Sequence, residues 1–341
     1  MNSRYQFSSK SILPLSDNQR KAKAKVAQKV DSGEYEFEEV GCIICNGTNR
    51  HKLSERDRYG LQYHVSACKT CGLVQTNPRM TQDAYSAFYS DHYRDLYNDG
   101  AKELSAFFSS QYRKAGAIAV FLRAQAFDLK GASILSVGCG AGGVLQYLKD
   151  RGAKVTGVDL NVAYLKFGRE KGLDLREGFI TEIPEGEKFD LIIYNHVMEH
   201  VLEPIQELAE VCKRLRPNGA VYIEVPGIKN LKSYHFDFLR YLQNAHVYHF
   251  SAKTLSNVLN IAGFEVISVD ESVRLFARFK KKHDNAAVVT SDLDDSLKYL
   301  QEAEKKRLSV GLLIKLKSNI LSFVVKVLDA FGIRKLYKSR P

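Results

Sequence analysis

Residues 134–143 read ILSVGCGAGG, an apolar strand that runs directly into a glycine-rich turn. A second apolar segment, KVTGVDL at 154–160, carries an acid near its end, Asp159, which follows Gly138 by 21 residues. Glycines in such a turn let the backbone approach a ligand, and an acid at this spacing accepts hydrogen bonds from ribose hydroxyls. The pattern therefore predicts an α/β fold with a nucleoside-binding crevice.

The glycines alone fit two classes of nucleoside-binding protein. Gly138, Gly140 and Gly143 match the dinucleotide fingerprint G-x-G-x-x-G. Gly138, Gly140 and Gly142 match the G-x-G-x-G pattern of S-adenosylmethionine (SAM) methyltransferases. A tight strand-to-helix turn without any ligand is the plainer alternative, and the acid at the expected spacing argues against it.

Three downstream segments favour the second class: FDLIIYN at 189–195, LRPNGAVYIEVP at 215–226 and NAHVYHFSAKTLSNVLNIAGFEVISVDE at 244–271. With these motifs in this order, the chain resembles class I SAM-dependent methyltransferases over roughly residues 110–280. The resemblance implies a Rossmann-like, seven-stranded α/β fold and SAM as cofactor. It implies the following cofactor-binding residues: Gly138, Gly140, Gly142, Asp159, Leu160, Phe179 and Asn195.

One position departs from the family pattern. Many members place an acid after the third strand to bind the adenine amino group, whereas this chain reads EGFITEIP, with Phe179 directly after Gly178. We expect adenine to stack on Phe179 or to be bound by backbone groups.

Four cysteines form a second motif upstream. Cys42, Cys45, Cys68 and Cys71 are spaced C-x2-C-x22-C-x2-C. Two such knuckles hold one tetrahedral metal ion, nearly always zinc in a structural site. A disulfide framework and a redox C-x-x-C are weaker alternatives, because the chain shows no apolar leader and a redox pair would not be duplicated. His51 and His64 could replace a cysteine ligand, although each is more simply a surface histidine.

The zinc motif is followed by CGLVQTNPRMTQDAYSAFYSDHYRDLY at 71–97 and then by the methyltransferase motifs. This arrangement resembles bacterial methyltransferases of deoxysugar and surface-polysaccharide pathways, including sugar C-methyltransferases with an N-terminal zinc domain. The resemblance implies that the zinc domain covers the active site and contributes a tyrosine. Tyr89, Tyr93 and Tyr97 lie in the matching stretch, and Tyr93 is our first choice. Packing along one helix face is the alternative for each of them.

Methyl transfer to a hydroxyl, or to a carbon beside a ketone, requires a group that removes a proton. Histidine titrates near neutrality, and His196, Glu199 and His200 follow the predicted strand 189–195. We expect them to lie on one side of a helix's first turn at the carboxyl end of the sheet. His246 and His249 form a second candidate group. The segment HVMEH also matches the inverted zincin signature H-x-x-E-H, and Glu199 could serve a purely structural role.

Composition predicts four segments in the 341 residues: a basic extension at 1–35, a zinc ribbon at 36–100, the methyltransferase domain at 101–285 and a basic helical tail at 286–341. The net charge of +11 is concentrated at the two ends. We expect the stretch through Gln28 to be poorly ordered or to form a loose helix. In the tail, apolar residues recur at helical spacing at Leu308, Leu312, Leu316, Ile320, Val324, Val327 and Phe331. This helix could contact an anionic membrane face, dock on the catalytic domain, or join two subunits in a homodimer.

The sequence therefore predicts a cytoplasmic enzyme that uses SAM and structural zinc and that could bind peripherally at the inner membrane face. We expect the acceptor to be a nucleotide-linked sugar or a polysaccharide-pathway intermediate. A small-molecule or quinone-type O-methyltransferase is the second hypothesis. An RNA methyltransferase is disfavoured by the basic ends on a mildly acidic core and by the lack of an N-P-P-[YF] motif. A protein that binds SAM without turnover is the last alternative.

Overall fold

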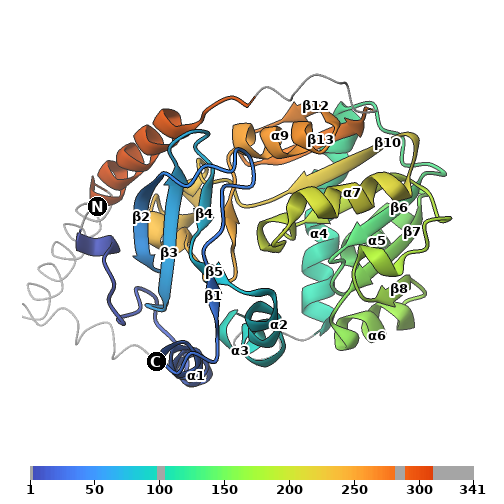
Figure 1. The fold of residues 1–341 in the computed structure, drawn as a ribbon. Helices are drawn as coiled ribbons and strands as arrows, with labels where there is room; N and C mark the ends of the chain where they lie inside the picture. The colour runs from blue at the N-terminus through green and yellow to red at the C-terminus, as the bar shows by residue number, and fades with distance from the viewer. Residues whose placement is uncertain (1–2, 98–103, 281–288, 310–341) are drawn as a thin grey trace, which may run out of the picture.

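The computed structural model describes residues 3–97, 104–280 and 289–309. A large mixed sheet with helices on both faces lies beside a smaller antiparallel sheet near the N-terminus (Figure 1). Within the smaller sheet, strands that are far apart in the sequence pair with one another. This pairing positions the functional site.

The large sheet has the strand order β12-β13-β10-β9-β6-β7-β8. Strands β8, β7, β6, β9 and β10 are parallel, and β13 runs antiparallel to β10 and β12. The predicted Rossmann-like, seven-stranded α/β fold is confirmed. The strand bounds are β6 Ser133–Val137, β7 Lys154–Asp159, β8 Asp174–Glu177, β9 Phe189–Asn195, β10 Leu215–Glu224, β12 Phe264–Val269 and β13 Arg274–Phe279.

Alternate residues of the central strands supply two separate cores. Ile134 and Ile193 pack with the helices on one face, α4 Leu104–Ala124 and α5 Gly143–Lys149. Leu135 and Ile192 face the opposite core, which includes residues of α7 Pro204–Arg214 and α9 Ala252–Ile261. Because both faces are covered, these strands are apolar throughout, as parallel strands usually are. Helix α6 Val162–Glu170 follows β7.

The strand order changes direction between β6 and β9. The chain moves outward from β6 through β7 to β8, and then returns to the other side of β6 as β9 and β10. Ligands of open parallel sheets bind at such a switch point, beyond the carboxyl ends of the strands. The glycine turn after β6 and the histidine segment after β9 lie on either side of it.

The smaller sheet has the order β11-β4-β3-β2, with bounds β2 Arg50–Arg56, β3 Gln62–Cys68, β4 Val74–Thr76 and β11 Tyr248–His249. Strand β11 belongs in sequence to the methyltransferase region, yet it pairs with β4, Tyr248 opposite Gln75 and His249 opposite Val74. Beside this sheet lie a two-stranded ribbon of β1 Phe37–Glu38 and β5 Arg79–Met80, and the helices α2 Gln82–Asp91 and α3 Tyr93–Tyr97.

The basic N-terminal extension is more ordered than its composition suggests. Residues Asp17–Asp31 form helix α1, which Ser16 and Gln19 begin with a capping box. Ala22 and Val26 are buried, and Val26 is fully enclosed. A short apolar stripe among lysines is therefore enough to dock this helix. Of the two options expected through Gln28, the structure shows the helix, and it is packed rather than loose.

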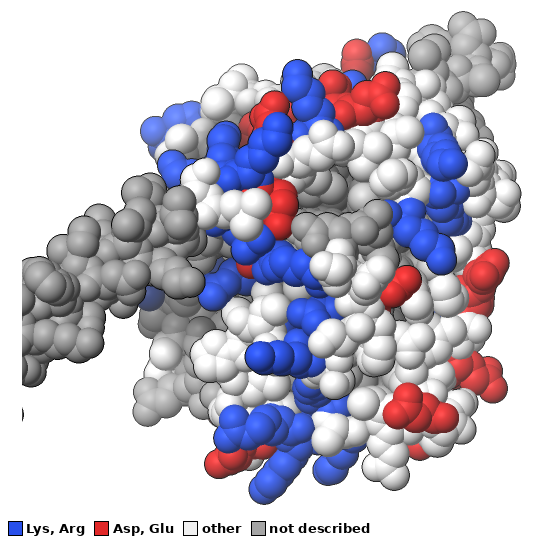
Figure 2. Space-filling view, turned by 90° about the vertical axis from the view of Figure 1, so that its left-hand side faces the viewer, with Lys and Arg blue, Asp and Glu red and all other residues white. Residues whose placement is uncertain are grey.

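Residues 289–309 return to the small sheet and include a helix over 293–309. The Asp292 N–H donates to the carbonyl of Cys71 at 3.1 Å, and its buried carboxylate pairs with Lys229 at 2.7 Å. Lys and Arg side chains form a band down the face that lies to the left in Figure 1 (Figure 2). The predicted apolar stripe from Leu312 onward lies outside the described residues. Within the described residues, no helix is long and apolar enough to cross a membrane.

The contact between Gly72 and residues 289–309 can be tested by adding one carbon atom. Gly72 has a φ of +79°, and a Cβ there would lie 2.3 Å from the Leu293 backbone nitrogen. Gly33 has a φ of +77° with nothing within 4 Å, so Gly33→Ala is a matched control. We expect Gly33→Ala to lower the free energy of unfolding by about 1 kcal/mol through backbone strain alone. Gly72→Ala should lower it by roughly 2 kcal/mol more, because the helix must also move. Urea unfolding measures both, and equal losses would contradict the packing described.

Candidate functional site

The glycine turn and the acid after β7 form the predicted nucleoside side of the site. Gly138, Gly140 and Gly142 have φ values of 65°, 58° and 83°, so the turn needs residues that accept left-handed backbone. The Asp159 carboxylate accepts the Gly140 N–H through Oδ2 and the Asn161 N–H through Oδ1, each at 2.8 Å. A carboxylate has about four lone-pair positions, so two remain for a ligand. Burial raises the pKa of Asp159, and the backbone N–H groups lower it in part.

The ends of β7 and β8 carry two exposed apolar side chains. The Gly178 N–H donates to the Asp159 carbonyl at 3.1 Å, which aligns the two strand ends. Leu160 and Phe179, which follow them, are 55% and 58% exposed. Large apolar side chains gain free energy when a ligand covers them. Leu160 and Phe179 are therefore suited to a flat apolar ring. Asn195, at the end of β9, is half-buried.

Helix α4 covers the glycine turn, which sequence reasoning missed. The Gln111 amide donates to the Cys139 carbonyl at 3.1 Å and accepts the Gly143 N–H at 3.2 Å. Phe107 stacks on Tyr164 with ring centroids 4.7 Å apart. No motif marks these residues, because each acts through a partner that is about 30 residues or more away in the chain.

The histidine segment after β9 is not the first turn of a helix, and that part of the prediction was wrong. His196 has a φ of 58°, and its N–H extends the pairing to the Glu224 carbonyl at 2.7 Å. A 3₁₀ turn follows at Met198–His200, and α7 begins only at Pro204. Proline is favoured at the first position of a helix, which explains the late start.

This irregular segment still gathers the predicted side chains around one carboxylate. Glu199 is 2% exposed. Its Oε1 lies 3.6 Å from His196 Nδ1, 3.8 Å from His200 Nε2 and 4.0 Å from His246 Nε2. Its Oε2 is buried without a hydrogen-bond partner among the described residues. A buried carboxylate is costly unless it has partners, so this arrangement favours a proton or positive charge on a neighbouring imidazole.

His196, His246 and His249 differ in basicity. Packing around His196 tends to lower its pKa, but Glu199 and the charge of Glu224 raise it overall. Burial, and then the neighbouring histidines, lower the pKa of His246 well below its usual value. Burial lowers the pKa of His249 to about 3. A general base works best with a pKa near the operating pH, so His196 is better suited than His246 or His249.

Two hydrogen-bonding groups contact one ring nitrogen of His200. Its Nδ1 lies 2.7 Å from the Tyr89 hydroxyl and 2.7 Å from the Ala245 carbonyl. The His196 side chain is half-exposed, and its Nε2 has no hydrogen-bond partner among the described residues. His196 therefore has a free nitrogen, while His200 is more constrained.

Of the three candidate tyrosines, Tyr89 reaches the histidines directly. Tyr93 stacks on Tyr89 with ring centroids 4.5 Å apart and lies edge-on to His200 at 6.4 Å. Burial raises the pKa of Tyr93 to about 12, with Glu199 and Asp159 adding to the rise. Tyr93 is thus close enough to respond to charges on both the glycine side and the histidine side. The Tyr97 hydroxyl instead accepts the Ala245 N–H at 3.2 Å.

The small sheet holds the second histidine pair in place. The Thr76 N–H donates to the Val247 carbonyl and the Val247 N–H donates to the Glu199 carbonyl, both at 2.9 Å. The Tyr63 hydroxyl lies 3.0 Å from His249 Nε2 and also contacts the His246 carbonyl. Tyr63 lies 183 positions before His246, so no local signal could have identified it.

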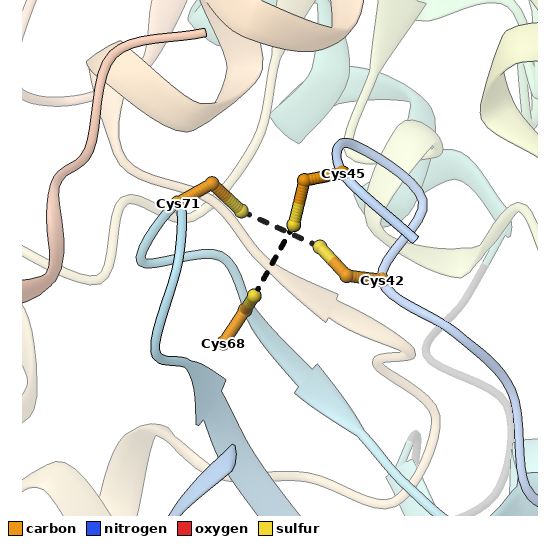
Figure 3. A group of neighbouring side chains, drawn as sticks. All are labelled: Cys42, Cys45, Cys68 and Cys71. Carbon is orange, nitrogen blue, oxygen red and sulfur yellow. Dashed lines mark hydrogen bonds between the residues drawn. The ribbon is translucent and has the colours of Figure 1, made fainter. Parts of the chain in front are cut away.

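The four cysteines converge on one point (Figure 3). Cys42 Sγ lies 3.4 Å from Cys71 Sγ, and Cys45 Sγ lies 3.4 Å from Cys68 Sγ. Sulfur atoms about 2.3 Å from one tetrahedral ion are roughly 3.8 Å apart, so this set fits zinc after a small expansion. Glu199, His200 and His246 form a second group whose donor atoms lie within 4.8 Å of one another. The predicted alternatives His51 and His64 do not join the cysteine group among the described residues.

Comparison with known families gives one domain match. Residues 109–269 match a family model described as a methyltransferase domain. This match and the strand order confirm the predicted class I SAM-dependent methyltransferase domain. The match does not include the cysteine motif.

Curated relatives include the ubiquinone biosynthesis O-methyltransferases of Pasteurella multocida (strain Pm70) and Bradyrhizobium diazoefficiens. The first is 34% identical over 119 residues, covering 30% of this chain and 49% of that protein. The second is 34% identical over 112 residues, covering 31% and 44%. The chain thus spans about half the length of the curated relatives it matches.

Solved structures include the Burkholderia thailandensis 1,6-didemethyltoxoflavin-N1-methyltransferase. It is 19% identical with a TM-score of 0.45, covering 69% of this chain and 100% of that one. The magnesium protoporphyrin IX methyltransferase of Synechocystis PCC 6803 is 15% identical with a TM-score of 0.42, covering 58% and 98%.

Proposed function

We propose that this protein transfers the methyl group of SAM to a hydroxyl oxygen of a small molecule. The observation that carries the proposal is the convergence of a glycine turn with Asp159 and of Glu199 with His196 at one switch point of the sheet. The names of the curated relatives favour a small-molecule or quinone-type acceptor over the sugar acceptor that we expected first. Oxygen rather than carbon as the accepting atom rests on the same names.

SAM supplies a methyl group on a positively charged sulfur. The chain's own residues bind it and prepare the acceptor. Asp159 holds the ribose hydroxyls through its two remaining lone-pair positions, and Leu160 and Phe179 cover the adenine ring. Backbone groups of the glycine turn approach the amino-acid end.

His196 acts as the general base. Its Nε2 accepts the proton of the acceptor hydroxyl as that oxygen bonds to the methyl carbon, and the sulfonium becomes a neutral thioether. Glu199, at 3.6 Å from Nδ1, stabilises the imidazolium that results. His200 is the second candidate for this role, and His246 and His249 line the acceptor side in their neutral forms. Tyr89 orients His200, and Tyr93 packs between the two halves of the site.

A sugar acceptor is the second candidate. It is favoured by the contacts of Tyr63 and Tyr89 from the N-terminal part with the histidine cluster, since the sugar-pathway resemblance implies such a contribution. Structural zinc bound by Cys42, Cys45, Cys68 and Cys71 belongs to the same proposal. Peripheral membrane contact, a homodimer and a cytoplasmic location stay predictions.

The role of Asp159 can be tested by its removal. Asp159→Ala should weaken SAM binding by about 2–4 kcal/mol, because one or two charge-assisted hydrogen bonds to the ribose are lost. Asp174→Ala, which removes a partly exposed acid on neighbouring β8, is the matched control and should bind SAM normally. Calorimetry measures both. Unchanged SAM affinity in Asp159→Ala would show that this acid does not hold the ribose.

The base can be identified from turnover, SAM affinity and melting temperature measured together. His196→Ala should lower turnover by roughly 10²–10⁴ and leave SAM affinity nearly intact. His200→Ala is the next variant, followed by His246→Ala and His249→Ala, and the exposed His51→Ala is the control.

The pH profile adds a second readout for the same residue. Glu199 raises the pKa of His196, so this base stays protonated, and therefore inactive, up to a higher pH. In a plot of rate against pH, the midpoint of the rise should lie above 6.5, the usual pKa of histidine. Glu199→Gln removes that charge and should shift the midpoint to lower pH. Near-normal rates in all four histidine variants would refute a histidine base, with Tyr93 the next residue to test.

Zinc content is the third test. Protein purified under reducing conditions should contain one zinc ion per chain. Cys42→Ser should lose it and destabilise the small sheet more than the large one, because metal binding contributes directly to folding free energy. Cys212→Ser, outside the cysteine group, should keep the metal. Elemental analysis without zinc would contradict the assignment.

A further inference from the structure

We propose that Arg58 recognises an anionic group on the methyl acceptor, a carboxylate or a phosphate. This inference rests on the proposed function and names a chemical property of its substrate. Arg58 lies in the turn between β2 and β3, at positions 57–61, where no motif pointed to a functional residue.

The turn is built to hold Arg58 in one place. The Asp57 side chain is fully buried, and its Oδ1 accepts the N–H groups of Tyr59 and Leu61, each at 2.9 Å. The Arg58 N–H donates to the Leu242 carbonyl at 3.1 Å, which ties the turn to the segment before His246. The guanidinium carbon lies 5.0 Å from the Tyr59 ring centroid and 5.5 Å from that of Tyr97. Aromatic rings at these distances fix the cation without neutralising it.

Among the described residues, Arg58 has no ion-pair partner within 4 Å. Its Nη2 donates to Gln243 Oε1 at 2.7 Å and to the Tyr59 hydroxyl at 3.3 Å, both uncharged groups. Its Nε is buried without a hydrogen-bond partner among the described residues. Asp57 is the nearest acid in sequence. Its Oδ1 is engaged by the turn, and its buried Oδ2 has no hydrogen-bond partner among the described residues, so no hydrogen bond joins this carboxylate to Arg58. Enclosing a cation with no paired anion is unfavourable, and a planar guanidinium fits a carboxylate or phosphate through two parallel hydrogen bonds.

The contacts of Arg58 connect it to the histidines on the acceptor side of the site. Gln243 contacts Arg58 through Oε1 and His246 Nε2 through its amide nitrogen, so it bridges the two. The charge of Arg58 contributes to the lowered pKa of His246, after burial and the neighbouring histidines. Burial raises the pKa of Tyr234, and the opposing charges of Arg58 and Glu199 both act on it. Arg58 and Glu199 therefore both act on His246 and Tyr234. An acceptor whose hydroxyl meets His196 could present its anion to Arg58.

Three probes that share one ring and differ in charge test the proposal: phenol, benzoate and phenyl phosphate. Calorimetry on the full chain saturated with S-adenosylhomocysteine should show at least about tenfold tighter binding of benzoate or phenyl phosphate than of phenol. Benzoate as the tighter ligand would indicate a carboxylate acceptor, and phenyl phosphate a phosphate one. Arg58→Gln should abolish the preference, and Arg58→Lys should keep part of it.

Arg56→Gln is the matched control. Arg56 is buried, whereas Arg58 is half-buried, and the Nη1 of Arg56 donates to the Ser8 carbonyl at 3.2 Å. This variant should keep the preference for anions. Gln243→Glu is a second variant that leaves Arg58 in place and offers it an internal carboxylate. It should weaken both anionic probes without weakening phenol.

The proposal is overturned if the wild-type protein binds all three probes equally, or if Arg58→Gln and Gln243→Glu both keep the preference. SAM affinity is measured on separate samples of the same proteins, prepared without S-adenosylhomocysteine. Absent SAM binding would overturn the proposed function, whereas normal SAM binding with no anion preference would overturn only the role of Arg58.

Discussion

The pairing of β4 with β11 is the interaction on which the site depends. It joins Val74–Thr76, directly after the second cysteine knuckle, to Tyr248–His249 of the methyltransferase region. Backbone hydrogen bonds continue the connection from Thr76 to Val247 and from Val247 to the Glu199 carbonyl. The small sheet is therefore linked through the backbone to the residue that carries the buried carboxylate. A segment of only two residues could not hold a stable strand alone. Its order comes from the sheet it joins, and that sheet in turn packs in hydrophobic cores shared with the methyltransferase region.

Glu199 is the second organising feature. Three histidine nitrogens approach one of its oxygens, and the other oxygen has no partner among the described residues. His196 combines a raised pKa with a half-exposed ring, whereas burial keeps His246 and His249 neutral. Burial and the distance to the Glu199 carboxylate thus give these chemically identical histidine side chains different protonation behaviour.

The features that could be predicted from the sequence are those defined by local patterns. The glycine turn, Asp159 and the cysteine spacing each depend on short-range geometry. The structure brings the glycine turn next to Asp159 and, at a separate place, brings the four cysteines together. The HVMEH segment was recognised by composition but assigned the wrong conformation. The left-handed backbone of His196 ends the strand, and Pro204 delays the helix. Tyr63, Gln111, Gln243 and Arg58 could not be predicted, because their partners are distant in sequence and each is an ordinary residue in its own segment.

Amide hydrogen exchange of the full chain, with and without a zinc chelator, tests the central claim most directly. If the small sheet holds the acceptor side in place, chelation should speed exchange at Val74–Thr76 and at Val247–His249 together. The central strands β6 and β9, buried on both faces, should stay protected. Faster exchange of β4 while Val247–His249 keeps its protection would contradict the account, because the histidine segment would then be ordered without the sheet it joins.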